Sequence, residues 1–545
     1  MITEKRSSSR RRFLKTVGGV SAVAGGMRLV LGDSLAAVPV PPASGRPSGN
    51  IFVGSRRQLL FDDFFVGPGN NFHESIPYGI RWSLGKVQKS PAGNIFKVQE
   101  PWHDRTAWFN VLYEDGRYRM WYAGGKVGRH GMFVCYAESD DGIEWRKPIL
   151  NLIERDGSKQ NNIVYTGGPA PGVGVGVELG NVFRDPVAKP EERYKMIYPS
   201  WEGNPSEEGV TLGATSPDGL HWTRTHGFFL PRYCDTQNVA MYDPVLQKYV
   251  AYVRWNSAAL YGELNAGEHP VRGLSRGRSV ARMESDDYAQ WSTPEVVLAP
   301  DFEDGLNVQF YGSSYSQYTE ADNAHFMFPA GYHVREGTFL VQVAVSRDNR
   351  TWVRPNRETY IPLGPAGSFD DHAVAVAPGF LSAGKDQCAL YYRAGNIAHP
   401  GALHEFLPKG TSGEAGVGRV VFKRDRMMGI ESGPEGGAFW TRPLMFEGKT
   451  LVVNVEPTGP DARLQVELIG VGNGASPPAW ARGEGMNDAR CPGYTFDENI
   501  PVTSDDLDAT VRWKERSSVG EWAGKPVRLY FRLRSMRIYA FQFVS

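Results

Sequence analysis

The chain is poor in cysteine and has no long apolar run. Its 545 residues include four cysteines, none with the Cys-x-x-Cys or Cys/His spacing of a zinc or redox motif. They are Cys135, Cys234, Cys388 and Cys491. We therefore predict no metal ion and no other cofactor, and expect buried thiols, with a disulfide formed after export as the alternative. No stretch after the N-terminus approaches the roughly 18 apolar residues of a membrane helix, so we expect no membrane association of the mature protein.

An excess of charge of one sign is also absent. Lys and Arg number 60, as do Asp and Glu. This balance argues against a polyanion-binding surface and predicts no nucleic acid partner. Long segments of helical period are missing, whereas 63 glycines, 37 prolines and 12% aromatic residues are typical of a turn-rich β protein.

The N-terminus has the composition of an export signal. Residues 9–15 read Ser-Arg-Arg-Arg-Phe-Leu-Lys, the twin-arginine pattern, and a mild apolar segment follows at 17–31. We predict a signal peptide at 1–36, a Pro/Gly/Ser linker at 37–55, and a periplasmic or secreted protein. A basic disordered tail is the alternative.

A short pattern, Ser-x-Asp-x-x-x-Trp, occurs four times in the middle of the chain. The copies begin at Ser139, Ser216, Ser285 and Ser346, each after a strand-like run. The Asp favours a turn because its carboxylate can accept hydrogen bonds from nearby backbone amides, and the Trp supplies a large apolar surface. Recurrence at a steady spacing indicates a repeat architecture.

The surroundings of the pattern recur too. Asn-Val begins a strand-like run at Asn110, Asn181 and Asn238, and a fifth unit without the pattern follows from about His372. Three or four strands per unit predict an all-β protein: a five-bladed β-propeller at 56–437 followed by a C-terminal β-sandwich at 438–545. A stack of β-sandwiches is the alternative. We expect residues 58–66 either to complete the last blade or to pack on the C-terminal domain.

Acidic residues stand just before the inner strand of most predicted blades. Because inner strands begin near the axis of a propeller, such residues converge on one mouth. Paired carboxylates are what cleavage of a glycosidic bond requires, one as acid and one as base or nucleophile. The predicted catalytic residues are Asp104, Glu178, Asp235, Asp370 and Asp371. Solvated turn residues are the alternative.

Aromatic side chains near the same strands suit stacking against sugar rings. His372 is a candidate to orient the acids or to bind a central ion. The predicted substrate-binding residues are Trp102, Trp108, Trp201, Tyr233, Trp255, Tyr311, His372 and Arg393. A carbohydrate is the expected partner.

Several short strings together resemble the five-bladed propeller glycoside hydrolases, a group of arabinanases, xylosidases, invertases and levansucrases, and within it an invertase-like bacterial branch. They span about residues 56–545 and include Leu-Phe-Asp-Asp at 60–63, Tyr-Arg-Met-Trp-Tyr at 118–122, Asn-Asn-Ile-Val at 161–164 and Lys-Pro-Val-Arg-Leu at 525–529. The resemblance implies the propeller fold and, more weakly, glycosidase activity.

One invertase motif matches as a string, Arg-Asp-Pro at 184–186. In the family its Asp stabilises the transition state. Alignment of the repeats instead puts Asp185 at the hairpin turn occupied by Asp243 and Asp115, and predicts a turn residue. The Trp-x-Asp-Pro-Asn and Glu-Cys motifs of invertases are absent.

Three functions are compatible with these patterns. The first is an exported glycoside hydrolase with Asp235 and Glu178 as the working pair. The second is a propeller that binds carbohydrate without cleaving it. The third, weaker one is a lyase or a sialidase-like enzyme, which would need an arginine triad that the sequence does not reveal.

Overall fold

The structure is a computed structural model. It describes residues 50–67, 76–97, 100–103, 105–125, 132–168, 176–200, 210–225, 229–230, 234–235, 237–257, 277–305, 307–399, 415–471 and 490–545. The predicted signal peptide at 1–36 lies outside these residues, as does most of the predicted linker. No helix of the described part has the length and apolar character of a membrane span.

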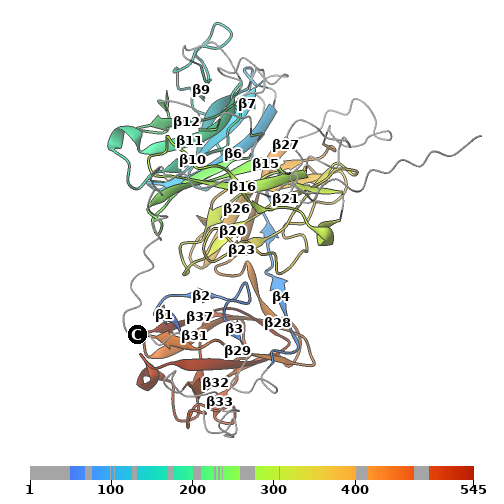
Figure 1. Ribbon diagram of the computed structural model, residues 1–545. Helices are drawn as coiled ribbons and strands as arrows, with labels where there is room; N and C mark the ends of the chain where they lie inside the picture. Colours follow the sequence, from blue (N-terminus) through green and yellow to red (C-terminus); the bar gives the residue numbers. More distant parts are fainter. Residues whose placement is uncertain are drawn as a thin grey trace, which may run out of the picture. The chain divides into compact units, whose positions relative to one another are not determined.

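Three successive units are four-stranded antiparallel sheets in which strands pair in sequence order (Figure 1). The first has strands β6 (Arg105–Glu114), β7 (Arg117–Gly125), β8 (Met132–Ser139) and β9 (Ile163–Tyr165). The second has β10 (Asn181–Arg184), β11 (Tyr194–Ser200), β12 (Val210–Ser216) and β13 (Thr223–Arg224). The third has β14 (Val239–Asp243), β15 (Lys248–Ser257), β16 (Gly277–Ser285) and β17 (Glu295–Leu298).

The fourth unit has the same order, but each strand is broken in two. Its halves are β18 (Val308–Phe310), β21 (Ala330–His333) and β22 (Thr338–Val341), and β19 (Ser316–Gln317), β20 (His325–Met327) and β23 (Ala344–Ser346). A single bridge between Val345 and Val353 stands where the outer strand lies in the other units.

The fifth unit takes its outer strand from the other end of the chain. Strands β24 (Ala373–Val376), β26 (Gln387–Gly395) and β27 (Ala415–Lys423) are joined by β5 (Gln88–Lys89), which pairs with β27, and by β25 (Leu381–Ser382). The closing strand therefore comes from residues 88–89. The segment at 58–66 does not complete the blade; it packs on the C-terminal domain, which was the second of the two expectations for it.

Contacts between units run around a complete circle. Strand β6 contacts β10, β10 contacts β14, β16 contacts β18, β22 contacts β24, and β26 contacts β6 again. Five sheets in such a circle are a five-bladed β-propeller, so the predicted fold class is confirmed, and the stack of sandwiches is excluded.

The recurrent asparagines join neighbouring blades. The side chain of Asn110 donates to the carbonyl of Val182 (2.8 Å) and accepts from its N–H (2.9 Å). Asn181 makes the same pair with Ala240, at 3.0 and 2.8 Å. A side-chain amide copies the peptide group, and so continues the ladder from one inner strand to the next.

The Ser-x-Asp pattern builds a turn, as predicted. In the first copy Ser139 Oγ accepts from the N–H of Gly142 (2.8 Å), and Asp141 Oδ1 accepts from those of Ile143 and Glu144 (both 2.8 Å). The fourth residue of every copy has a positive φ; these residues are Gly142 (73°), Gly219 (80°), Tyr288 (63°) and Asn349 (53°).

These turns also tie the blades together. Tyr391 of blade five donates to the carbonyl of Gly142 (2.7 Å), and Trp121 of blade one donates to that of Gly219 (2.7 Å). The pattern is thus a structural device between blades, which explains its recurrence without reference to function.

The β-sandwich is built from both ends of the chain. One sheet holds β1 (Ile51–Gly54), β3 (Val66–Gly67), β29 (Gly437–Thr441), β30 (Leu444–Phe446), β32 (Arg463–Gly470) and β36 (Val527–Arg534). The other holds β2 (Gln58–Leu59), β4 (Ile80–Leu84), β28 (Met428–Ser432), β31 (Thr450–Pro457), β34 (Asp506–Thr510) and β37 (Met536–Val544). A small pair, β33 (Asn499–Ile500) and β35 (Arg512–Trp513), lies beside them, and the described helices are the short 3-10 turns η2 (Pro190–Glu192), η3 (Phe302–Asp304) and η5 (Gly520–Trp522).

This pairing differs from the predicted boundaries. In Figure 1 the blue strands β1–β4 lie among the orange and red strands of the C-terminal part. Residues 51–54, expected in the linker, form a strand, and residues 58–67, 76–84 and 428–432, expected in the propeller, belong to the sandwich. The reason is burial: Val53, Leu60 and Phe65 lie in the same core as Ile430 and Phe541, all at most 2% exposed.

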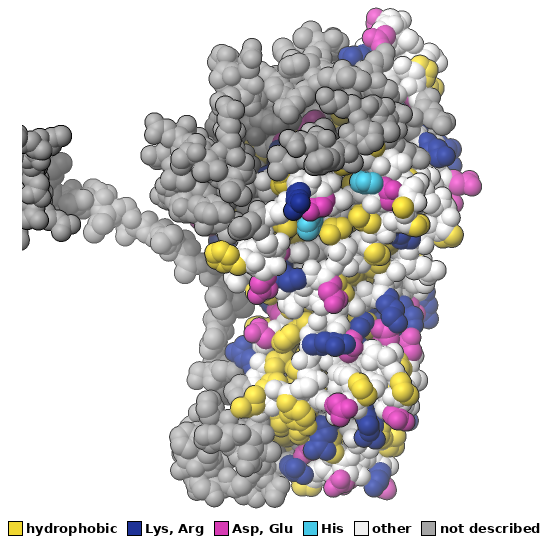
Figure 2. Space-filling view, turned by 90° about the vertical axis from the view of Figure 1, so that its right-hand side faces the viewer, with side chains coloured by type: hydrophobic (Ala, Val, Ile, Leu, Met, Phe, Trp, Pro, Cys, Tyr) yellow, Lys and Arg dark blue, Asp and Glu magenta, His cyan; other side chains and the backbone are white. Residues whose placement is uncertain are grey.

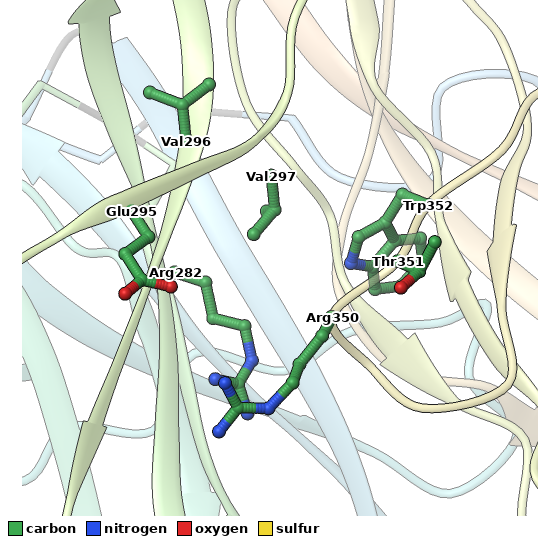
Figure 3. A pocket seen from close by; sticks show the side chains of 7 residues that line it. All are labelled: Arg282, Glu295, Val296, Val297, Arg350, Thr351 and Trp352. Atoms are coloured by element: carbon green, nitrogen blue, oxygen red, sulfur yellow. The ribbon is translucent and has the colours of Figure 1, made fainter.

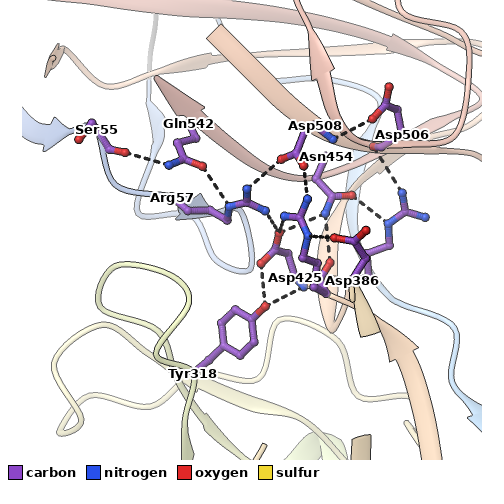
Figure 4. Close-up of polar contacts among 11 residues, drawn as sticks. Ser55, Arg57, Tyr318, Asp386, Asp425, Asn454, Asp506, Asp508 and Gln542 are labelled. Atoms are coloured by element: carbon purple, nitrogen blue, oxygen red, sulfur yellow. Dashed lines mark hydrogen bonds and ion pairs between the residues drawn. The ribbon is translucent and has the colours of Figure 1, made fainter. Parts of the chain in front are cut away.

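A polar network joins the sandwich strands to the last blade (Figure 4). Arg57 donates to Asp425 and pairs with Asp508 (2.8 Å), while Tyr318 of blade four donates to Asp425 (2.8 Å). Asn454 of β31 donates to the same carboxylate (3.2 Å). Asp425 has 0% of its side chain exposed, and these donors supply the hydrogen bonds that a buried carboxylate requires.

Candidate functional site

Tyr311, one residue beyond β18, is the centre of a cluster drawn from several blades. Its ring stacks against Trp108 of β6, with ring centroids 6.1 Å apart and planes at 24°. Tyr332 and Phe339 of blade four pack edge-on to it. Blade one and blade four, on opposite sides of the ring of sheets, thus meet at one aromatic platform.

Three arginines stand over this platform. The guanidinium carbon of Arg254 lies 4.7 Å from the centroid of the Tyr311 ring, and that of Arg278 lies 5.0 Å from it. Arg393 lies 5.3 Å from the centroid of the Trp108 ring. Arg254 and Arg278 come from β15 and β16 of blade three, whereas Arg393 comes from β26 of blade five.

Asp235 lies in this cluster. Its Oδ2 is 2.5 Å from Nη2 of Arg254. Its charge also acts on Arg278, Tyr311 and His399. The residue stands four positions before β14, as the argument from inner strands expects.

Glu178 reaches the same cluster from blade two. Its backbone N–H donates to the carbonyl of Pro199 (3.1 Å), which fixes the segment before β10. Its carboxylate acts on the charge of Arg393. Since Arg393 covers Trp108 and acts on His399, which Asp235 also influences, both predicted acids face one group of side chains.

The phenol of Tyr311 stays protonated. Burial, and then the charge of Asp235, raise the pKa of Tyr311, and the charges of Arg254 and Arg278 offset only part of this. His399 Nε2 lies 3.1 Å from the Tyr311 hydroxyl, and burial together with the arginines lowers the pKa of His399 to about 4. A neutral histidine beside a neutral phenol suits hydrogen bonding to a ligand better than attack on it.

Two other predicted acids have structural partners. Asp370 is 3% exposed and accepts from Lys89 (2.6 Å), Ser368 (2.8 Å) and Tyr392 (3.0 Å). Tyr392 points to the face of β26 opposite Arg393, so Asp370 holds the closing strand β5 and lies away from the cluster. These contacts give Asp370 a structural role, and none of them supports the predicted catalytic one.

Asp371 and His372 form a pair of their own. Asp371 accepts from His372 Nδ1 (2.6 Å) and from the N–H of Gly367 (2.7 Å). Burial would raise the pKa of Asp371, but these hydrogen bonds more than reverse the effect, and its pKa is lowered. An acid held ionised in this way is a poor proton donor.

The remaining predicted residues divide into two groups. Trp102 donates to Asn162 (2.9 Å) and packs on the core of blade one, and Trp255 packs on the core between blades two and three, so both serve the fold. Asp104, Trp201 and Tyr233 lie outside the described residues.

Asp185 of the Arg-Asp-Pro string lies at the hairpin turn between β10 and β11. It accepts from the N–H of Val187 (3.0 Å) and from the Tyr249 hydroxyl (2.7 Å), and it is 3% exposed. Its interpretation as a turn residue is confirmed. It stands at the end of β10 opposite to Glu178.

Sequence reasoning missed Arg254, Arg278 and His399. Arg254 interrupts the apolar run of β15 and is itself 10% exposed, and a charged residue inside an apolar strand-like run was a usable signal. Arg278 and His399 carried no such mark. The described residues contain no group of three or more His, Cys, Asp and Glu side chains able to hold a metal ion.

A separate cavity of about 400 Å³ lies where the fourth turn meets blade three (Figure 3). Arg282 and Arg350 line it, but both pair with Glu284, the former at 2.7 Å. Arg282 also donates to Asn349 of the turn (2.7 Å). The charges of Arg282 and Arg350 therefore stabilise the contact between blade three and the fourth turn. On the face in Figure 2, basic and acidic side chains of the described residues alternate without a field of one sign.

Comparison with known proteins gives distant likenesses only. No family model and no curated protein matches the chain. Among solved structures, it is similar to an N-acetylgalactosamine deacetylase from F. plautii bound to blood group B trisaccharide (15% identity, TM-score 0.44, 63% of this chain and 96% of that one). It is also similar to a glycosyl hydrolase from Bacteroides ovatus (15%, 0.42, 63% and 95%) and to a member of the GH130 family of mannoside phosphorylases, which contains glycoside hydrolases that target β-1,2-mannosidic linkages in Candida mannan (15%, 0.41, 63% and 95%). At such TM-scores no activity carries over to this chain.

Proposed function

We propose that this protein is an exported glycoside hydrolase that cleaves a polysaccharide or oligosaccharide at the Tyr311 cluster. The observation that carries the proposal is the presence of two carboxylates from different blades, Asp235 and Glu178, at one aromatic platform. Twin-arginine export rests on residues 9–15 alone.

The surroundings of the two acids support different roles. Asp235 contacts the guanidinium of Arg254, which favours its charged form and suits a nucleophile or a base. Glu178, which is partly buried, is then the proton donor to the leaving oxygen. Trp108 and Tyr311 provide flat apolar faces on which a sugar ring stacks.

A sialidase-like mechanism fits less well. It has the arginines and a tyrosine, but the raised pKa of Tyr311 disfavours a phenolate nucleophile. The remaining alternative is a propeller that binds carbohydrate without cleaving it. Such a protein would bind its glycan at the same cluster and would differ only in not cleaving it.

The test is a screen of the mature protein against plant and marine polysaccharides, with released sugars as the readout. We expect Asp235→Asn and Glu178→Gln each to lower turnover of the responding glycan at least about 100-fold, as loss of an acid or base does. The matched control is Asp140→Asn, whose side chain is 64% exposed in the first turn. No turnover of any glycan, or unchanged turnover in both variants, would contradict the proposal.

Chemical rescue separates a reacting carboxylate from a positioning one. Addition of azide to Asp235→Ala should restore cleavage and yield a glycosyl azide, because the small anion enters the space of the lost carboxylate. If Asp235 only orients Arg254, azide should not restore cleavage by the Asp235→Ala variant.

A further inference from the structure

The arginines at the Tyr311 cluster have more hydrogen-bond donors than the described residues accept. A guanidinium group carries five N–H donors in a planar fork. Arg278 donates to Gln309, a neutral acceptor, at 2.5 Å, and otherwise contacts the rings of Tyr311 and Tyr332. Most of its fork is thus left for another group.

The other two arginines have buried donors without a partner. Nη1 of Arg254 and Nε of Arg393 are shielded from solvent, and no described atom accepts from them. Buried N–H groups on a charged side chain are costly when unpaired, by about 1–3 kcal/mol or more each. Such a group calls for an acceptor, which a water molecule, an ion or a bound ligand can supply.

The charges at the cluster do not balance either. Among the described residues, the carboxylates that act on Arg254, Arg278 and Arg393 are Asp235 and Glu178. Three cations thus face two anions, which leaves one positive charge. His399 adds none near neutral pH, because its pKa is about 4.

The charges of the three arginines are compensated unequally. Burial and the neighbouring Arg254 lower the pKa of Arg278, and burial lowers that of Arg393. At Arg254 the charge of Asp235 has the opposite effect, and the pKa is raised. Arg278 and Arg393 are therefore the arginines whose charge is compensated least.

We propose that the cluster binds the oxyanion of an acidic sugar, a singly charged carboxylate or sulfate ester, whose ring stacks on Trp108 and Tyr311. The fork of Arg278 matches the two oxygens of such a group, and Arg254 and Arg393 flank it. Among the described residues one positive charge is in excess, and it matches one negative charge on the ligand. A doubly charged phosphate would exceed it.

This inference deepens the proposed function, on which the choice of a sugar as ligand rests, by naming the substrate class as glycans that contain uronic acid or sulfated sugar. Asp235 and Glu178 keep their roles. The arginines position the sugar, and their charge restricts which glycans bind productively.

Calorimetric titration tests binding without turnover. The probes are D-glucuronate, D-galacturonate and a monosulfated glucose, each beside neutral D-glucose or D-galactose, with a glucose phosphate added to compare charges. We expect the singly charged sugars to bind with a Kd on the order of 1 mM or tighter, at least about ten-fold tighter than the neutral parents. Added salt should weaken this preference.

Variants tie the preference to the cluster. Arg278→Gln should abolish it, Arg278→Lys should retain part of it, and Arg117→Gln, at a half-exposed arginine of blade one, should leave it unchanged. Glu178→Gln removes one negative charge, so it should tighten binding of the sugar acids several-fold while turnover falls. Circular dichroism and thermal melting show that each variant is folded.

The outcomes separate the two proposals. Equal affinity for acidic and neutral sugars, no binding of any acidic probe, or a preference that survives Arg278→Gln would overturn this inference. Sugar acids that bind as expected with no glycan cleaved would overturn hydrolysis alone. Cleavage of a neutral glycan by a protein without acid preference would overturn the anion site alone.

Discussion

The Tyr311 cluster and the junction around Asp425 use the same residue types and differ in how the charges are matched. At the junction Arg57 meets Asp425 and Asp508, and Arg424 meets Asp386 at 2.9 Å. At the Tyr311 cluster, three arginines meet two carboxylates and a glutamine among the residues that the structure describes.

The pKa shifts separate the two regions further. Burial alone would lower the pKa of Arg57, but the ion pairs with Asp425 and Asp508 more than reverse this and raise it. The pKa of Arg278 is lowered. The ion pairs of Arg57 therefore hold parts of the fold together, whereas Arg278 is the arginine whose charge is left for a ligand in our proposal.

The largest effect should come from breaking the junction. Asp425→Ala leaves Arg57 and Tyr318 without their shared buried acceptor, and we expect a loss of about 3–5 kcal/mol in the free energy of unfolding. Denaturant unfolding measures it. Asp508→Ala is the control: its side chain is 48% exposed, and its loss should cost about 1 kcal/mol or less. Equal losses in the free energy of unfolding for the two variants would contradict the expectation that the more buried aspartate contributes more.

A substitution at the Tyr311 cluster should have little effect on stability. Arg278→Met removes a charge that no carboxylate of the described residues contacts, and keeps an apolar stem over Tyr311. We expect the free energy of unfolding to stay within about 1 kcal/mol of the wild type, or to rise as repulsion from Arg254 disappears. Unfolding curves for this variant and Asp425→Ala, run together, make the comparison direct. A loss as large as that of Asp425→Ala would show that Arg278 is structural.

The smallest and most local effect concerns His399. Its folded pKa, about 4, lies below the ordinary value of 6.5, so its contribution to stability is present above pH 6.5 and lost as pH falls from 6.5 toward 4. Since Arg278 is the charge that lowers it most after burial, Arg278→Gln should raise the pKa of His399. A histidine titration by NMR measures both values. An unchanged pKa would mean that burial alone sets it.

Much of the fold could be predicted because its signals are local. The Ser-x-Asp turn closes on hydrogen bonds between Asp141 and residues two and three positions away, and the strands alternate with visible turn residues. Asn110 and Asn181 were noticed as repeats, but their role as links between blades needs the neighbouring strand to be seen.

The site could be predicted in part. Asp235 and Glu178 were found from their place before an inner strand, and Trp108, Tyr311 and Arg393 were among the predicted binding residues. Asp370 occupies an equivalent place in sequence, yet its partner Lys89 comes from a strand 281 positions away. The position of a residue before a strand does not reveal an ion-pair partner that is distant in the sequence.

The sequence by itself determined the repeated turn, the strand pattern and therefore the five sheets, because each depends on hydrogen bonds and alternation within a few residues. Only the tertiary structure decided that residues 51–67 and 76–84 complete the sandwich, that residues 88–89 complete the last blade, and that Arg254, Arg278 and Arg393 share one platform. Those outcomes depend on which faces are buried together once the ring closes, and burial of one side chain against another is a property of two distant segments rather than of either one.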